Sequence, residues 1–213
     1  MDLIFGKPAG IIKDALVIAD LHLGIEFELE QKGINIPSQF KPFAQEIREL
    51  AEGCERIIIV GDLKHTITGF SWPEKLYLPE FIRSLEKEVI LVKGNHDGDI
   101  EKYLDIQVTP PGGFEYENYW LFHGHARPDE LRDYMVMAHV HPVIHIKDTL
   151  GGVITEKVWV KAKFEDRKLL IMPAFNSIIS GIDVHEITGL KGLDLKNARI
   201  YSLEGEYLGK VNA

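Results

Sequence analysis

Residues 89–98 read VILVKGNHDG and place a compact polar cluster directly after a buried strand. The first four residues are apolar, which is typical of a strand that is covered on both faces of a parallel sheet. An amide, an imidazole and a carboxylate follow at Asn95, His96 and Asp97. Such a cluster forms a turn or binds a ligand, and we expect it to do both. Gly94 is expected to permit the tight exit from the strand.

The sequence around this stretch predicts a layered α/β fold. Short apolar runs at 15–19, 56–60 and 88–92 alternate with helical patterns at 40–51, behind Ser38 as the expected cap, and at 77–85. Strand, helix, strand, helix, strand favours parallel pairing, with helices covering the sheet. After Tyr103 the pattern is dominated by strands and Gly- or Pro-rich turns, so a second sheet is expected to pack on the first. Residues 174–197 show no period and are expected to form a lid, rim or interface.

Composition limits the classes of function. The 213 residues are 45% hydrophobic and 27% charged, as in a soluble protein of one domain, and the formal charge of -9 disfavours a broad electrostatic grip on nucleic acid. Lys157, Lys161 and Lys163 are expected on one solvated strand face. Cys54 is the single cysteine, which excludes an internal disulfide and favours the cytoplasm. We expect no export signal, and no apolar run is long enough for a membrane span.

Polar residues follow five strand-like runs, and these sites gather seven of the nine histidines. A single Asp or His after a strand is usually a turn, a cap or a hydrogen-bond partner of the backbone. Turn formation alone does not explain five such polar clusters, each directly after a strand-like run. Because the carboxyl ends of strands line one crevice in an open α/β sheet, we expect the first three clusters to meet in space, while the other two come from the β-rich half. Carboxylate, imidazole and amide ligands without thiolate suit first-row metal ions, and two such ions are a usual device against phosphate. The five motifs are Asp20-Leu21-His22, Gly61-Asp62-Leu63-Lys64-His65, Gly94-Asn95-His96-Asp97, His123-Gly124-His125 and His139-Val140-His141.

In this order and form, the five motifs resemble those of the calcineurin-like metallophosphoesterases, most closely the archaeal SbcD-related and DNA-ligase-associated phosphoesterases. The resemblance spans residues 20 to 141 and implies a four-layer αββα sandwich of two mixed β-sheets flanked by helices, as a single domain over residues 1–213. It also implies two divalent ions, with Mn²⁺ as the first choice and Fe, Zn, Ni or Mg as alternatives. The implied ligands are Asp20, His22 and His141 for one ion, Asn95, His123 and His139 for the other, and Asp62 as the bridge.

The same resemblance implies that His96 is no ligand. It would lie near the transferring phosphoryl group and stabilise its charge or protonate the leaving oxygen, while a hydroxide held between the ions attacks. His65 stands where many phosphomonoesterases of the superfamily have an aspartate that orients the catalytic histidine. A His beside His96 resembles the nuclease branch and favours phosphodiesters. Ala138 departs from the usual glycine before His139, and we expect the loop to shift slightly.

Other polar and aromatic residues have weaker predictions. His125 could face the cleft or make a surface hydrogen bond, Glu26 could border the site, and Arg127 could meet a substrate phosphate. Asp97 is expected to cap the short segment DGDIEKYL, since a carboxylate is favourable near a helix N-terminus. His145 and His185 are expected to have ordinary roles, and Trp72, Trp120 and Trp159 are expected to serve packing.

These predictions leave three readings of function. The first is a dinuclear metal-dependent phosphodiesterase or nuclease, with nucleic acid or a nucleotide as the substrate. The second is a phosphomonoesterase. The third is a metal-binding interaction scaffold without turnover, which is disfavoured because all expected ligand positions are filled. A homodimer is compatible with each reading, and a membrane partner is not expected. The sequence does not choose among DNA, RNA and cyclic nucleotides.

Overall fold

The apolar runs of the first half form a six-stranded sheet in the computed structural model, which describes residues 1–147, 149, 151–188 and 190–211. Neighbouring strands follow chain order, and β3, β4, β5 and β6 run parallel, as predicted for the three central runs. Two antiparallel strands precede them. The bounds are β1 (Asp2–Leu3), β2 (Gly10–Ile12), β3 (Ala15–Ile18), β4 (Arg56–Val60), β5 (Glu88–Val92) and β6 (Gln107–Thr109).

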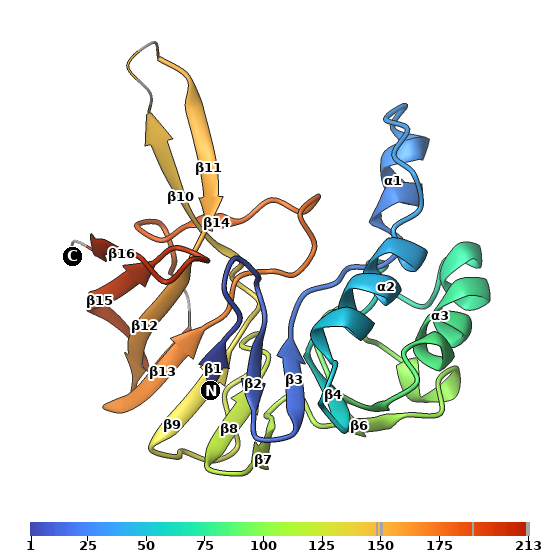
Figure 1. Ribbon diagram of the computed structural model, residues 1–213, viewed down its shortest axis with the longest axis horizontal. Coiled ribbons are helices and arrows are strands. Elements are labelled where there is room, and N and C mark those ends of the chain that lie inside the picture. The colour runs from blue at the N-terminus through green and yellow to red at the C-terminus, as the bar shows by residue number, and fades with distance from the viewer. Residues whose placement is uncertain (148, 150, 189, 212–213) are drawn as a thin grey trace.

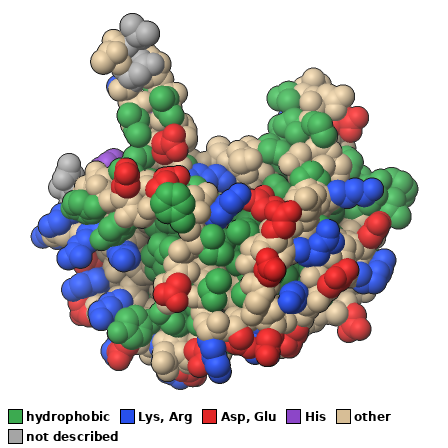
Figure 2. Space-filling model, in the orientation of Figure 1, with side chains coloured by type: hydrophobic (Ala, Val, Ile, Leu, Met, Phe, Trp, Pro, Cys, Tyr) green, Lys and Arg blue, Asp and Glu red, His purple; other side chains and the backbone are tan. Residues whose placement is uncertain are grey.

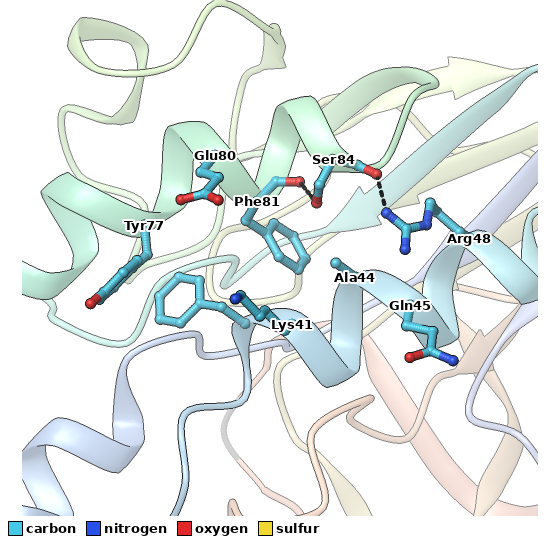
Figure 3. Close-up of a pocket in the computed structure, with 9 residues that line it drawn as sticks. Lys41, Ala44, Gln45, Arg48, Tyr77, Glu80, Phe81 and Ser84 are labelled. Carbon is cyan, nitrogen blue, oxygen red and sulfur yellow. Dashed lines mark hydrogen bonds between the residues drawn. The ribbon is translucent and has the colours of Figure 1, made fainter.

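Helices cover the outer face of this sheet (Figure 1). They are α2 (Phe40–Leu50) and α3 (Trp72–Ser84), followed by the 3-10 turn η1 (Ile100–Lys102), whereas α1 (Ile25–Gln31) projects away from the sheet. Ser38 is not the cap of α2, because Gln39 occupies that position and makes no side-chain cap bond. Helix α3 begins earlier than its apolar spacing predicts, since Ser71 and Glu74 form a capping box there. Between α2 and α3, an apolar groove is bordered by Arg48, which donates to the Ser84 carbonyl at 2.8 Å (Figure 3).

The second half forms a seven-stranded mixed sheet in the order β16-β15-β12-β13-β9-β8-β7. The β8, β9 and β13 strands run parallel, and the outer pairs run antiparallel. The bounds are β7 (Phe114–Tyr116), β8 (Tyr119–Phe122), β9 (Tyr134–Met137), β12 (Trp159–Phe164), β13 (Arg167–Ile171), β15 (Leu193–Tyr201) and β16 (Tyr207–Lys210).

The two sheets pack face to face through a shared core, which confirms the predicted α/β sandwich of two mixed sheets. Ile58 and Val60 of the first sheet lie in one buried cluster with Val136 and Trp159 of the second. On the outer face of the second sheet, the covering side chains include Val184 and Ile187. They belong to an irregular segment, so the fourth layer is not helical among the described residues.

A third, three-stranded sheet carries a projecting hairpin (Figure 1). Its strands are β10 (Pro142–Lys147), β11 (Val153–Lys157) and β14 (Ile182–Asp183), in the order β11-β10-β14. Figure 2 shows hydrophobic side chains on this hairpin and over α1, the other projection of the molecule. No helix in the described part of the chain is long and apolar enough to cross a membrane.

Candidate metal centre

The predicted ligands meet at the carboxyl ends of strands from both large sheets. Residues that follow β3, β4 and β5 come from the first sheet, and residues that follow β8 and β9 come from the second. Their imidazole nitrogens and carboxylate oxygens form groups in which all atoms lie within 4.8 Å of one another. The groups are Asp20, His22 and His141; Asp62, His123 and His139; and His22, His65 and His96.

Asp62 lies between the first two groups. Its Oδ2 is 3.5 Å from Nε2 of His22 and 3.3 Å from Nε2 of His123. The side-chain oxygen of Asn95 is 3.3 Å from the same nitrogen of His123. All seven predicted ligands are therefore brought together, with the carboxylate of Asp62 at their centre.

Backbone carbonyls orient two of the imidazoles. Nδ1 of His123 donates to the carbonyl of Val60 at 2.9 Å, and Nδ1 of His141 donates to that of Ser180 at 3.2 Å. In the neutral ring, a donating Nδ1 leaves Nε2 as the acceptor. Nε2 of each ring points into the cluster, which is the arrangement of a metal-binding histidine with its supporting partner.

The oxygen and nitrogen atoms that could bind metal in this cluster suit a divalent cation. Oδ1 of Asp20, Nε2 of His22 and Nε2 of His141 are buried side-chain atoms without a hydrogen-bond partner among the described residues. Buried polar atoms without partners are costly unless an ion or water satisfies them. Burial lowers the pKa of His22 to about 3 and that of His139 to about 4, so both rings are neutral at pH 7, the form that binds metal.

The backbone is strained at five of the seven predicted ligands. Left-handed conformations cost a residue other than glycine on the order of 1 kcal/mol each and persist where the surroundings enforce them. Such strain concentrates at functional sites, so it supports a functional reading independently of the side-chain chemistry. The φ angles are 54° at Asp20, 42° at His22, 52° at Asp62, 71° at His139 and 44° at His141.

Two glycines make room for these side chains. A Cβ on Gly61 would lie 2.0 Å from the His123 ring, and one on Gly94 would lie 2.1 Å from Oδ1 of Asp62. Gly94 does not adopt a positive φ, so its expected role in a tight strand exit is replaced by a requirement for space.

His65 and His96 lie beside the ligands as a pair. Their ring centroids are 5.7 Å apart, and Nδ1 of His96 is hydrogen-bonded to the backbone carbonyl of His65. Because Nδ1 donates to that carbonyl, Nε2 of His96 is left facing the cluster, 3.9 Å from Oδ2 of Asp62. The His65 ring is held by Glu28, whose Oε2 lies 2.8 Å from Nε2.

Comparison with known proteins agrees with this geometry. A profile of the calcineurin-like phosphoesterase family matches residues 14–194. The chain belongs to this family. The phosphoesterase is also similar to a solved structure, the nuclease MPE of Pseudomonas putida, with 25% sequence identity, a TM-score of 0.67 and 96% of each chain covered. No curated protein sequence matches it. The chain is thus a metal-dependent hydrolase of phosphoric esters.

Asp97 of the phosphoesterase does not cap a helix, contrary to the prediction. Its buried carboxylate accepts from four backbone amides, and burial and the charge of Asp62 raise its pKa to about 6. The segment is only one 3-10 turn, which offers little helix dipole. The carboxylate instead joins the ends of β4 and β5. The donors are Asp62 (2.8 Å), Gly94 (2.9 Å), Leu63 (3.0 Å) and Lys64 (3.4 Å).

Lys157 was expected on a solvated face with Lys161 and Lys163, but its ammonium group is buried against the residue 174–176 backbone. It donates to the carbonyls of Ala174 at 2.6 Å and Asn176 at 2.8 Å. Burial lowers its pKa to about 8. The Asn176 side chain donates to Leu21 at 2.8 Å, so the start of the 174–197 segment is a rim fixed to the site. The roles of Lys157 and Asn176 were not predicted from the sequence, because neither is a metal-binding side chain placed directly after a strand.

The weaker predictions have mixed outcomes. The His125 ring lies 5.3 Å from the His123 ring, so it borders the cluster, as one of its two readings required. Glu26 is buried and accepts from the amide of Gln39 at 3.0 Å, which is a structural contact at the edge of the site. Arg127 pairs with Glu165 at the surface.

Proposed function

We propose that this chain is a dinuclear metal-dependent phosphodiesterase that acts on nucleic acid or on a nucleotide diester. The observation that carries the proposal is the position of Asp62, within 3.5 Å of nitrogens from both ligand groups. When bound, the two ions would supply an activated water as the nucleophile and positive charge opposite the phosphoryl oxygens. Asp20, His22 and His141 would hold one ion, Asn95, His123 and His139 the other, and Asp62 both.

His96 would act on the substrate and not on the metal. Its Nδ1 donates to the carbonyl of His65, so Nε2 is the atom that can reach a phosphoryl or leaving oxygen. In the protonated form it would stabilise negative charge or protonate the leaving oxygen.

His65 supports a diester over a monoester substrate. An aspartate at this position would add a negative charge near the phosphoryl group, whereas an imidazole adds none, and Glu28 keeps this ring in place. The similarity to a nuclease points the same way. Mn²⁺ is the metal we expect first, and a relation to the SbcD-type nucleases, a homodimer and a cytoplasmic location stay part of the same proposal.

A comparison of two chromogenic esters tests the proposal. Protein stripped of metal and reloaded with Mn²⁺ should hydrolyse bis-p-nitrophenyl phosphate faster than p-nitrophenyl phosphate. Faster turnover of the monoester would favour a phosphomonoesterase, and inactivity with Mn²⁺, Fe²⁺, Zn²⁺, Ni²⁺ and Mg²⁺ would favour a scaffold. His65→Asp should shift the ratio towards the monoester, and an unchanged ratio would remove the argument from His65.

A further inference from the structure

A pocket of about 640 Å³ opens beside the metal centre, between α1 and the start of α3. His65 lies on its wall, so the pocket adjoins the side of the cluster where His65 and His96 lie. Its size is within the range of small-molecule sites. No site residue named so far requires this space.

An exposed tryptophan forms one side of the pocket. Trp72 is 72% exposed, whereas Trp120 and Trp159 are buried. Phe27 also lines the pocket and stacks on Tyr77 with ring planes 7° apart. Trp72 is therefore not a core packing residue, because most of its surface is exposed. An open indole is a surface on which a planar ring can stack.

Glu74 holds Trp72 in place relative to His65 and His96. This carboxylate is fully buried and accepts from the amides of His65 (3.1 Å), Thr66 (2.8 Å) and Ser71 (2.7 Å). It thus fixes both ends of the loop between His65 and the first residue of α3, which is Trp72. Preorganisation of this kind lowers the entropy lost when a ligand binds.

The charges of the pocket disfavour phosphate. Its ionisable side chains include Glu28 and Glu30 but no Lys or Arg among the described residues that line it. A phosphate would be repelled there, while a neutral ring that donates hydrogen bonds through amino or imino groups would be accepted. Glu28 pairs with Lys32 through Oε1 at 2.5 Å and contacts His65 through Oε2 at 2.8 Å, and each oxygen keeps a further lone pair for such a donor.

We propose that this pocket binds the nucleobase next to the scissile phosphate, stacked on Trp72, on the side where His65 and His96 lie. The inference rests on the proposed phosphodiesterase function and gives it a substrate class, a nucleic acid strand with an unstacked base. Since a base inside a duplex is stacked on its neighbours and cannot enter, single strands or frayed ends are the preferred substrates.

Paired substrates test the pocket. The Mn²⁺-loaded protein is given a short single-stranded oligonucleotide and a base-free oligomer with the same phosphodiester backbone. Trp72→Ala should raise KM for the oligonucleotide on the order of tenfold, the size of one base–aromatic stack, and leave the base-free oligomer unchanged. Trp72→Phe should retain most of the affinity. Tyr207→Ala, which removes an aromatic side chain 55% exposed on β16, is the matched control. Equal losses on both substrates, or no loss on either, overturn the inference.

A binding measurement keeps the test independent of turnover. Trp72 is the exposed tryptophan, so a nuclease-resistant phosphorothioate strand should quench emission of the metal-loaded protein, and the Trp72→Phe variant should lose that quenching. Binding by anisotropy without quenching, or no binding, excludes a base in this pocket. Inactivity towards bis-p-nitrophenyl phosphate with all five metals would instead refute the proposed function.

Discussion

Replacing Asp97 tests how the ends of β4 and β5 are held together. In Asp97→Ala, the three amides of Asp62, Gly94 and Leu63, at 2.8 to 3.0 Å, lose their acceptor inside the protein. Each unsatisfied buried amide costs about 1.5 kcal/mol, or about 4.5 kcal/mol for three. Part of this loss is offset, because the wild-type protein has the cost of burying the ionised Asp97 carboxylate and the variant does not. The rise of its pKa from 3.8 to about 6 corresponds to about 3 kcal/mol at pH 7, which the variant regains.

The expected net loss is therefore about 1.5 kcal/mol in the free energy of unfolding, or a fall of about 4 °C in Tm. Urea and thermal unfolding of the metal-free protein, followed by circular dichroism, measure both. Asp97→Asn should cost about as much, because its amide group would face two backbone N–H donors. Glu101→Ala, which removes a surface ion pair with Lys93 nearby, should change the free energy by less than about 0.5 kcal/mol. Losses that small in both Asp97 variants would refute the reasoning.

Three further outcomes are expected. Asp62→Asn should lower the occupancy of both ions together by elemental analysis, and two retained ions would contradict its bridging role. Burial opposes protonation of His123, but Asp62 raises its pKa to about 9. A metal ion must therefore displace a proton from His123, and the affinity for metal should rise with pH up to about 9. Calorimetry in buffers of different ionisation enthalpy measures the proton release. Lys157→Met should hasten proteolysis within residues 174–180 by freeing that backbone, whereas Lys163→Met at the surface should not.

The site was predictable from sequence wherever its side chains directly follow strands. Asp20, Asp62 and Asn95 each stand after an apolar run, and the topology of parallel strands brings such positions to one edge. The histidines of the second sheet could be placed only through the resemblance, because strand patterns alone do not say which sheet edges face each other. Long-range packing decides that point.

Supporting contacts could not be predicted for a physical reason. Asp97 accepts from amides 33 to 35 residues away, and Lys157 donates to carbonyls 17 to 19 residues away. Their partners are backbone groups, which every residue type offers, so the sequence carries no mark of them. Gly94 was misread similarly, since the Asp62 carboxylate that needs its space lies on another strand.

The ligand groups draw their members from both halves of the sandwich, and this has a consequence for folding kinetics. Asp62 and Asn95 leave the first sheet, whereas His123 and His139 leave the second. Neither half can assemble a complete ligand set alone, so ions would bind tightly only after the sheets dock. Bound ions would then link the two large sheets, and their release would have to precede or accompany separation of the sheets. Chelators should consequently accelerate unfolding more than they retard refolding.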